Sequence, residues 1–244
     1  MATNPRFELT GSVDGVDTLV VGVSTFGLAG LTAVDYLTDQ RPMEKAGHLT
    51  GGGPPPITPF QDGVPRHHTR AYVDDEQSFA VVVGERMVTL DAASGVADAI
   101  EKLCRTLDTE TVVVLSGVPV AHGPDDHVPF YIATEGYRTA FLDEADIRPM
   151  GNGFLDGLPA ELVDRGIERT DFDVGVYTTP VHPQAPDAAA ALRLLDALSS
   201  VHGIDIDTGP LEAFAANVES HYQALAERLE SQQEDLIPDD RMYM

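Results

Sequence analysis

The first place where the sequence could support chemistry is a glycine turn near the N-terminus. Gly22 and Gly27 follow an apolar segment with the spacing of the two glycines in a phosphate-binding P-loop. That motif requires Lys and then Ser or Thr after the second glycine, whereas Leu28 and Ala29 occupy these places. The turn therefore lacks both the phosphate-binding cation and the magnesium ligand. We expect Gly27 and Gly30 to allow a helix and a strand to pack closely instead.

A serine in the same turn is a second candidate. Ser24 could act as a nucleophile on a strand-to-helix turn, but the hydrolase elbow has glycine two residues before and two residues after its serine. Gly22 meets this requirement and Phe26 does not. We therefore expect Ser24 or Thr25 to cap the N-terminus of the following helix.

The densest group of potential metal ligands is the segment from His122 to His127. Its two histidines, together with Asp125 and Asp126, could bind Zn²⁺ or Mn²⁺, but a turn-rich loop imposes no fixed coordination geometry. A solvated loop with capping carboxylates explains the same residues. Metal binding by this loop stays open, and the sequence predicts no resident cofactor and no catalytic residue.

The last three residues, Met242, Tyr243 and Met244, differ from their surroundings. They follow the segment 238–240, whose proline and two aspartates block a helix and favour solvent. An exposed apolar terminus usually has a receiving partner. This one offers a phenol ring, a neighbouring thioether and a terminal carboxylate that a buried lysine could pair with. A frayed chain end is the alternative interpretation.

The composition is strongly acidic. The chain has 244 residues, with 40 Asp and Glu against 15 Lys and Arg, and a formal charge of −25. The only lysines are Lys45 and Lys102. Such a surface argues against nucleic acid and anionic membranes as partners, because both are bound through clustered positive charge. In molar salt the Debye length falls to about 3 Å, so an acidic, lysine-poor surface suits a salt-rich cytosol. We expect a halophilic source.

Targeting and redox signals are few. Residues 1–11 lack the apolar core of a signal peptide, and no run reaches the roughly 18 apolar residues of a membrane span. Cys104 is the only cysteine, so an internal disulfide is excluded, and its helical setting predicts a buried side chain. We expect a cytoplasmic protein.

Short apolar strands alternate with amphipathic helices, which predicts an α/β sheet covered on both faces, followed by a C-terminal helix. Asp187 is expected to cap one helix that Gly203 ends. The expected strands are 18–23, 69–73, 78–83, 111–115 and 173–177, and the expected helices are 31–37, 92–107, 130–142, 158–165, 188–202 and 210–229. Residues 47–66 are expected to be a long loop with at most a short strand.

The chain divides into three predicted parts: an α/β core domain over 1–206, a helix over 207–235 and a flexible tail over 236–244. Apolar residues recur along the helix at three- and four-residue steps from Leu211 to Leu229. This stripe could form an oligomer surface or pack against its own domain.

Three segments, in this order and spacing, resemble archaeal proteasome assembly chaperone homologues. The first is Gly27–Leu37 after a buried strand, and the second is Gly151–Leu158 followed by Gly166 and Ile167. The third is Pro186–Leu192 with Gly203–Asp207. The resemblance covers about residues 15–230.

The resemblance implies a three-layer α/β/α sandwich similar to the phosphorylase/hydrolase-like fold, with C-terminal helices. It also implies a homo-oligomer without catalytic residues. Some archaeal members end in a hydrophobic-Tyr-any tripeptide that docks between proteasome α-subunits, and Met242, Tyr243 and Met244 match it. We therefore expect a non-enzymatic protein that docks on the α-ring of the 20S proteasome as an assembly chaperone or regulator.

The alternative is a hydrolase or phosphorylase-like enzyme with its site at the strand ends. Its site would lie near Ser24–Gly27 and Ser116–His127. That hypothesis requires the two loops to meet in one pocket that contains His122 or His127 together with Asp125.

Overall fold

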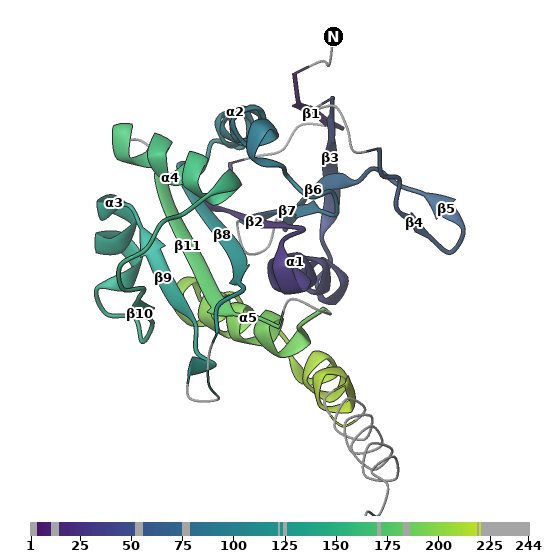
Figure 1. Cartoon of the computed structure of the whole chain (residues 1–244). Coiled ribbons are helices and arrows are strands. Elements are labelled where there is room, and N and C mark those ends of the chain that lie inside the picture. The colour runs from purple at the N-terminus through teal and green to yellow at the C-terminus, as the bar shows by residue number, and fades with distance from the viewer. Residues whose placement is uncertain are drawn as a thin grey trace, which may run out of the picture.

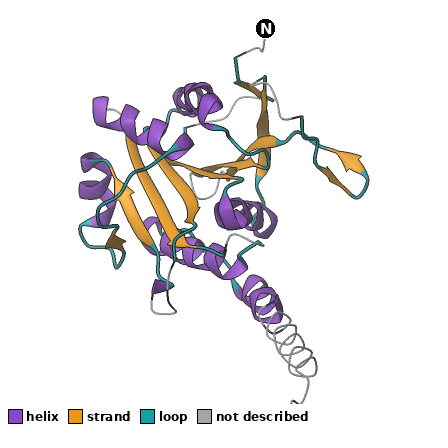
Figure 2. Cartoon of the chain, viewed as in Figure 1, coloured by secondary structure: helices purple, strands orange, loops and turns teal. Residues whose placement is uncertain are grey.

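The computed structural model describes residues 4–10, 15–51, 56–74, 79–121, 123, 126–169, 172–182, 186–218 and 220. These residues form a large sheet with helices on both faces (Figures 1 and 2). The strands of that sheet are β1 (Arg6–Leu9), β2 (Thr18–Val23), β3 (Glu44–Thr50), β6 (Thr69–Asp74), β7 (Phe79–Gly84), β8 (Thr111–Val118), β9 (Phe130–Ala133), β10 (Arg148–Pro149) and β11 (Asp173–Pro180). The helices are η1 (Phe26–Leu28), α1 (Ala29–Gln40), α2 (Leu90–Leu107), α3 (Glu135–Tyr137), η3 (Arg138–Leu142), α4 (Gly157–Glu168) and α5 (Ala188–His202).

The sheet has nine strands in the order β1-β3-β6-β7-β2-β8-β11-β9-β10. Its centre, β7-β2-β8-β11, is parallel, whereas β6, β3 and β1 continue one side as antiparallel neighbours. On the other side, β9 runs antiparallel to β11. All six residues of β2 are buried, as expected for a strand covered on both faces.

The two faces of the sheet carry separate hydrophobic cores. Val20 of β2 packs with α1 and α5, and the next residue, Val21, packs with α2 and α4. This division follows from the alternation of side chains along a strand. The predicted α/β class, with helices on both faces of one sheet, is confirmed. Cys104 of α2 is buried in the second core, as expected, and burial raises the pKa of its thiol to about 12.

Glycines bring α1 directly onto the centre of the sheet. A Cβ on Gly30 would lie 2.0 Å from the carbonyl oxygen of Leu115 in β8, and one on Gly22 would lie 2.3 Å from the carbonyl oxygen of Gly30. Gly27 has a φ of +65°, and its Cβ would lie 2.8 Å from Cβ of Val181. The predicted packing role of Gly27 and Gly30 is therefore confirmed.

Two sequence expectations about secondary structure were wrong. The first residues of the expected loop over 47–66 belong to β3 instead. β3 lies toward one side of the sheet, and its polar sequence lacks the clear alternation of apolar and polar residues that indicates a strand. The expected helix over 130–142 begins as strand β9, since Phe130–Ile132 is aromatic and β-branched. Helical structure starts only after Thr134, whose Oγ1 accepts a hydrogen bond from the Tyr137 backbone N–H.

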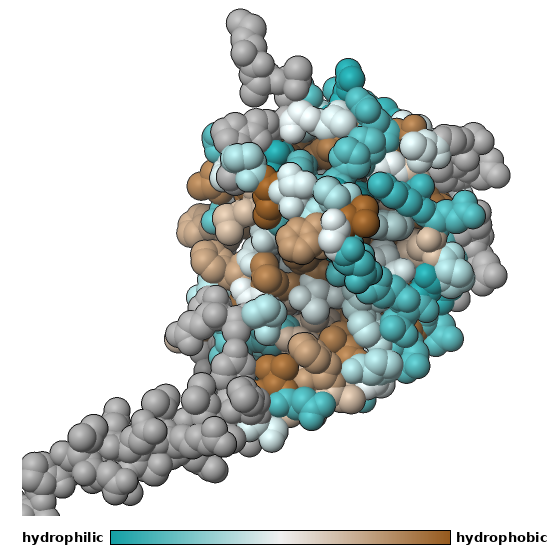
Figure 3. Space-filling view, turned by 90° about the vertical axis from the view of Figure 1, so that its right-hand side faces the viewer, coloured by the Kyte–Doolittle hydropathy of each residue, from teal (hydrophilic) through white to brown (hydrophobic). Residues whose placement is uncertain are grey.

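A small hairpin stands apart from the body on the side of β3 (Figure 1). It consists of β4 (Phe60–Gln61) and β5 (Val64–Pro65), and the side chains of Phe60 and Val64 are exposed. A view from that side shows hydrophobic residues gathered on one part of the face and hydrophilic residues on another (Figure 3). Among the described helices, none combines the length and the apolarity needed to cross a bilayer.

The segment that follows α5 lies beside the C-terminal end of α1. As predicted, Asp187 caps α5 by accepting a hydrogen bond from the Ala190 N–H, and Gly203 ends that helix with a φ of +66°. Tyr36 then donates a hydrogen bond of 2.6 Å to the carbonyl oxygen of Asp207. Residues 209–218 are helical and project from the body (Figure 1). Leu211 is buried, whereas Phe214 is 55% exposed.

A buried polar chain crosses the core under α5. The hydroxyl of Tyr137 lies 2.8 Å from that of Tyr177 and 2.7 Å from Nε2 of His202. A Cβ on Gly175 would lie 2.4 Å from the Tyr137 ring, so only glycine leaves room for it. Burial lowers the pKa of His202 to about 4 and raises the pKa of Tyr137. His202 is therefore neutral in the folded protein.

This burial predicts acid sensitivity. The pKa of His202 is about 4 in the fold against 6.5 for a free side chain, so the unfolded chain takes up a proton that the fold excludes. The stabilisation is complete above pH 6.5 and is lost as the pH falls toward 4, by up to roughly 3 kcal/mol in the free energy of unfolding. Urea denaturation at both ends of this range should show that His202→Gln loses less stability than the unmodified chain.

Val64→Gln provides the control. Val64 is exposed on the β4–β5 hairpin, and neither its side chain nor that of glutamine binds a proton, so this variant should lose as much stability on acidification as the unmodified chain. Equal acid sensitivity of the unmodified chain and His202→Gln would contradict this assignment.

Candidate functional site

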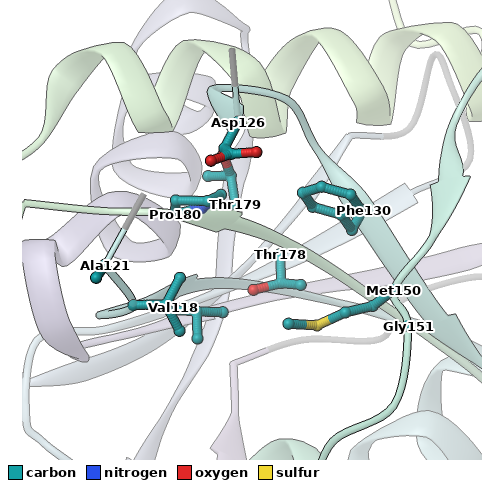
Figure 4. Close-up of a pocket in the computed structure, with 10 residues that line it drawn as sticks. Val118, Ala121, Asp126, Phe130, Met150, Gly151, Thr178, Thr179 and Pro180 are labelled. Carbon is teal, nitrogen blue, oxygen red and sulfur yellow. The ribbon is translucent and has the colours of Figure 1, made fainter. Parts of the chain in front are cut away.

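Two neighbouring clefts open at the carboxyl ends of the parallel strands. The larger, of about 570 Å³, lies among the ends of β2 and β8, the N-termini of α2 and α4, and the loop before α4. The smaller, of about 320 Å³, lies between the ends of β8 and β11 and the segments around Asp126 and Met150 (Figure 4). Val118, Met150 and Thr178 line both. We call the two clefts together the strand-end groove.

The rim of the larger cleft is apolar and exposed. Phe154 is fully exposed, Leu90 is 71% exposed, and Phe26 and Met87 are each more than half exposed. These side chains come from the loop before α4, the first residue of α2, the first residue of η1 and the segment after β7. Scattered exposed apolar residues are ordinary, but four around one cleft mark a surface that can receive an apolar group.

Helix N-termini meet in this cleft without side-chain caps. Thr89 precedes α2 and Asp156 precedes α4, and neither side chain accepts a capping hydrogen bond from its helix. The first backbone N–H groups of a helix have no partner within the helix and carry partial positive charge. The N-termini of α2 and α4 therefore both open into the larger cleft.

Two buried hydroxyls in the groove also lack partners. Oγ1 of Thr25 and Oγ1 of Thr178 are shielded from solvent and form no hydrogen bond. Thr178 as a whole is only 2% exposed. Figure 4 shows its side chain in the space between Val118 and Met150. A buried hydroxyl without a partner costs about 1–3 kcal/mol, which a bound polar group would recover.

The hydroxyl of Thr179, the next residue of β11, has hydrogen-bond partners. Thr179 donates a hydrogen bond of 3.1 Å to the carbonyl oxygen of Val128 and accepts one of 2.9 Å from Nε of Arg193. Because successive strand residues face opposite sides, the hydroxyl of Thr178 lies on the side of the larger cleft, whereas that of Thr179 bonds toward α5, although Thr179 also lines the smaller cleft. Of these two adjacent hydroxyls, only that of Thr178 lacks a partner.

The predicted cap by Ser24 or Thr25 was wrong. Thr25 stands at the N-cap position of η1, but its side chain makes no capping bond. The reason is the extra turn η1, in which Gly27 and Leu28 both have positive φ, between β2 and α1. This turn separates the hydroxyls from the first turn of α1. Sequence analysis therefore missed the actual setting of Thr25 in the wall of a cleft.

The two loops of the enzyme hypothesis do meet, but without its acid–base residues. Residues 24–26 and 116–119 line the larger cleft, which contains no histidine among its described lining residues. His127 packs edge-on against His182 with ring centroids 5.6 Å apart, and His182 Nδ1 lies 2.9 Å from Oδ2 of Asp187. His122 and Asp125 lie outside the described residues. The arrangement gives the enzyme hypothesis no support.

The potential metal-binding loop has other contacts where it is described. Asp126 accepts a hydrogen bond of 3.0 Å from the backbone N–H of Gly123, as a turn-capping carboxylate does. Among the described residues, no group of three or more His, Cys, Asp or Glu side chains could hold a metal ion. The predicted docking residues Met242, Tyr243 and Met244 lie outside the described residues.

Residues 19–226 match the PAC2 family, and the chain belongs to that family. Among solved structures it is similar to PbaA of Pyrococcus furiosus, an archaeal homolog of proteasome-assembly chaperone, with a TM-score of 0.80, 18% identity and coverage of 95% of this chain and 96% of that one. PbaB of Pyrococcus furiosus, an archaeal proteasome activator, matches with a TM-score of 0.75, 16% identity and coverage of 91% and 99%.

A protein of unknown function from Thermoplasma acidophilum is similar as well, with a TM-score of 0.74, 20% identity and coverage of 91% of both chains. The curated proteins contain no sequence that matches significantly. At these identities the structural matches establish a shared fold over almost the whole chain.

Replacing one or the other of the two adjacent threonines of β11 by valine should change the free energy of unfolding in opposite directions. Thr178→Val replaces a hydroxyl without a partner by a methyl group of the same shape, so the free energy of unfolding should rise by about 1 kcal/mol. Thr179→Val leaves two partly buried partners unpaired and should lower it by about 1–3 kcal/mol. Urea denaturation of both variants measures the difference, and destabilisation by Thr178→Val as large as that by Thr179→Val would contradict the assignment.

Proposed function

We propose that this chain binds the proteasome, as an assembly chaperone or regulator that docks on the α-ring of the 20S core particle. The main support is the fold. The chain belongs to the PAC2 family, and it superposes over nearly its full length with both an assembly-chaperone homolog and a proteasome activator. These two structural relatives, both connected with the proteasome, favour a proteasome partner over a separate enzymatic role.

The docking element is the C-terminal tripeptide. Tyr243 fills a pocket between two α-subunits, Met242 packs beside it, and the carboxylate of Met244 pairs with a lysine in the pocket. Residues 230–240 connect this element to the rest of the chain. They supply about 3.3 Å of reach per residue when extended.

Several tails act together. One tripeptide is a small contact, and useful affinity requires linked copies, because each further tail then binds at high effective concentration. The chain therefore works as a homo-oligomer. Phe214, exposed on the helix over 209–218, offers part of a surface for self-association.

The acidic composition fits the same proposal. With a formal charge of −25, the chain meets a large partner through a tail rather than through a broad charged surface. High salt screens the repulsion between copies. Binding is accordingly expected in molar salt.

The test compares variants of the tail in binding to purified 20S particles in molar salt. Tyr243→Ala should weaken binding at least tenfold, about 1.4 kcal/mol per tail, because the pocket loses its ring. Tyr243→Phe should retain most of the affinity, since it keeps the ring. Deletion of residues 242–244 should abolish binding.

Val64→Ala serves as the control, because it removes an exposed apolar side chain on the β4–β5 hairpin. It should bind like the unmodified chain. Unchanged affinity of Tyr243→Ala, with an unaltered circular dichroism spectrum, would refute docking through the tail.

A further inference from the structure

We propose that the strand-end groove binds a small uncharged molecule that carries several hydroxyl groups on one side and a flat apolar part on the other. A nucleoside and an aryl glycoside both have this chemistry. The proposal does not rest on proteasome docking, since it is argued from the described lining residues of the groove alone.

The charges around the groove favour an uncharged ligand. No lysine, arginine or histidine is among its described lining residues, so an anion finds no side-chain counter-charge. The carboxylates of Asp156 and Asp126 repel it further. A cation is disfavoured by the uncapped N-termini of α2 and α4, which present partial positive charge. Asp91 in the first turn of α2 and Asp156 before α4 offset the attraction of these helix ends for an anion.

The polar groups of the groove favour hydroxyls on the ligand. Backbone N–H groups at the helix N-termini require acceptors, whereas the Asp156 carboxylate requires a donor. A hydroxyl group can serve as either. Oγ1 of Thr178 and Oγ1 of Thr25, both buried and without a partner, can likewise donate to or accept from such a ligand.

The apolar rim favours a flat hydrophobic part. Phe26, Leu90 and Phe154 expose their side chains around the larger cleft, and a ring seated among them would remove apolar surface from water. A volume of about 570 Å³ lies within the range of small-molecule sites. Size, polarity and charge thus agree on one class of ligand.

The test measures binding of adenosine and of 4-nitrophenyl β-D-glucoside to the full chain by calorimetry at millimolar ligand. At least one should bind, and the comparison distinguishes the two sources. Thr178→Val should weaken that binding about fivefold, because a ligand hydroxyl loses its partner. Phe154→Ala should weaken it as well without affecting folding, since Phe154 is fully exposed.

Thr38→Val is the matched control, because its hydroxyl bonds to the carbonyl oxygen of Asp35 inside α1, away from the groove. It should bind like the unmodified chain. Adenosine 5′-monophosphate should bind at least tenfold more weakly than adenosine, because the described lining residues of the groove include carboxylates and no cationic side chain. No binding of either neutral probe, tighter binding of the monophosphate, or equal affinity of Thr178→Val would each overturn the proposal.

Discussion

The close approach of α1 to the parallel centre of the sheet is the constraint on which the rest of the molecule depends. The carbonyl oxygen of Leu115 occupies the space that a Cβ on Gly30 would need, and the carbonyl oxygen of Gly30 occupies the space that a Cβ on Gly22 would need. Any side chain at either place would push the helix off the sheet, because interiors are close-packed and backbone atoms cannot yield. The helix is therefore held directly over β2 and β8, and η1 is forced to turn through two residues with positive φ before it.

This geometry places the groove and the start of the C-terminal segment at opposite ends of α1. At the end where α1 begins, the strand ends and the uncapped N-termini of α2 and α4 surround a groove with unpartnered hydroxyls. Where α1 finishes, Tyr36 and Arg41 bind the carbonyl oxygens of Asp207 and Asp205 and hold the start of the C-terminal segment. The proposed ligand site therefore does not overlap the residues that hold this segment.

The sequence predicted those elements whose signals are local. Val20 lies in a continuous apolar run, which predicts a strand buried on both faces. Asp187 and Gly203 mark the two ends of α5, because one caps its N-terminus and the other ends it with a positive φ. Sequence analysis failed where long-range contacts decide: β3 is a strand because β1 and β6 pair with it. Of the groove, the sequence indicated only that the loops at Ser24–Gly27 and Ser116–His127 could meet at the strand ends. That Thr178 lacks a partner while Thr179 has two depends on what packs on each face, which no single sequence reveals.

The division into two ends is tested most directly by photo-crosslinking. With p-benzoylphenylalanine at position 243, irradiation in the presence of 20S particles should link this chain to α-subunits. With the same residue at position 154, in the groove rim, it should not, although the side chain there is fully exposed. Crosslinks from position 154 and none from position 243 would show that the strand-end groove, and not the chain end, meets the proteasome.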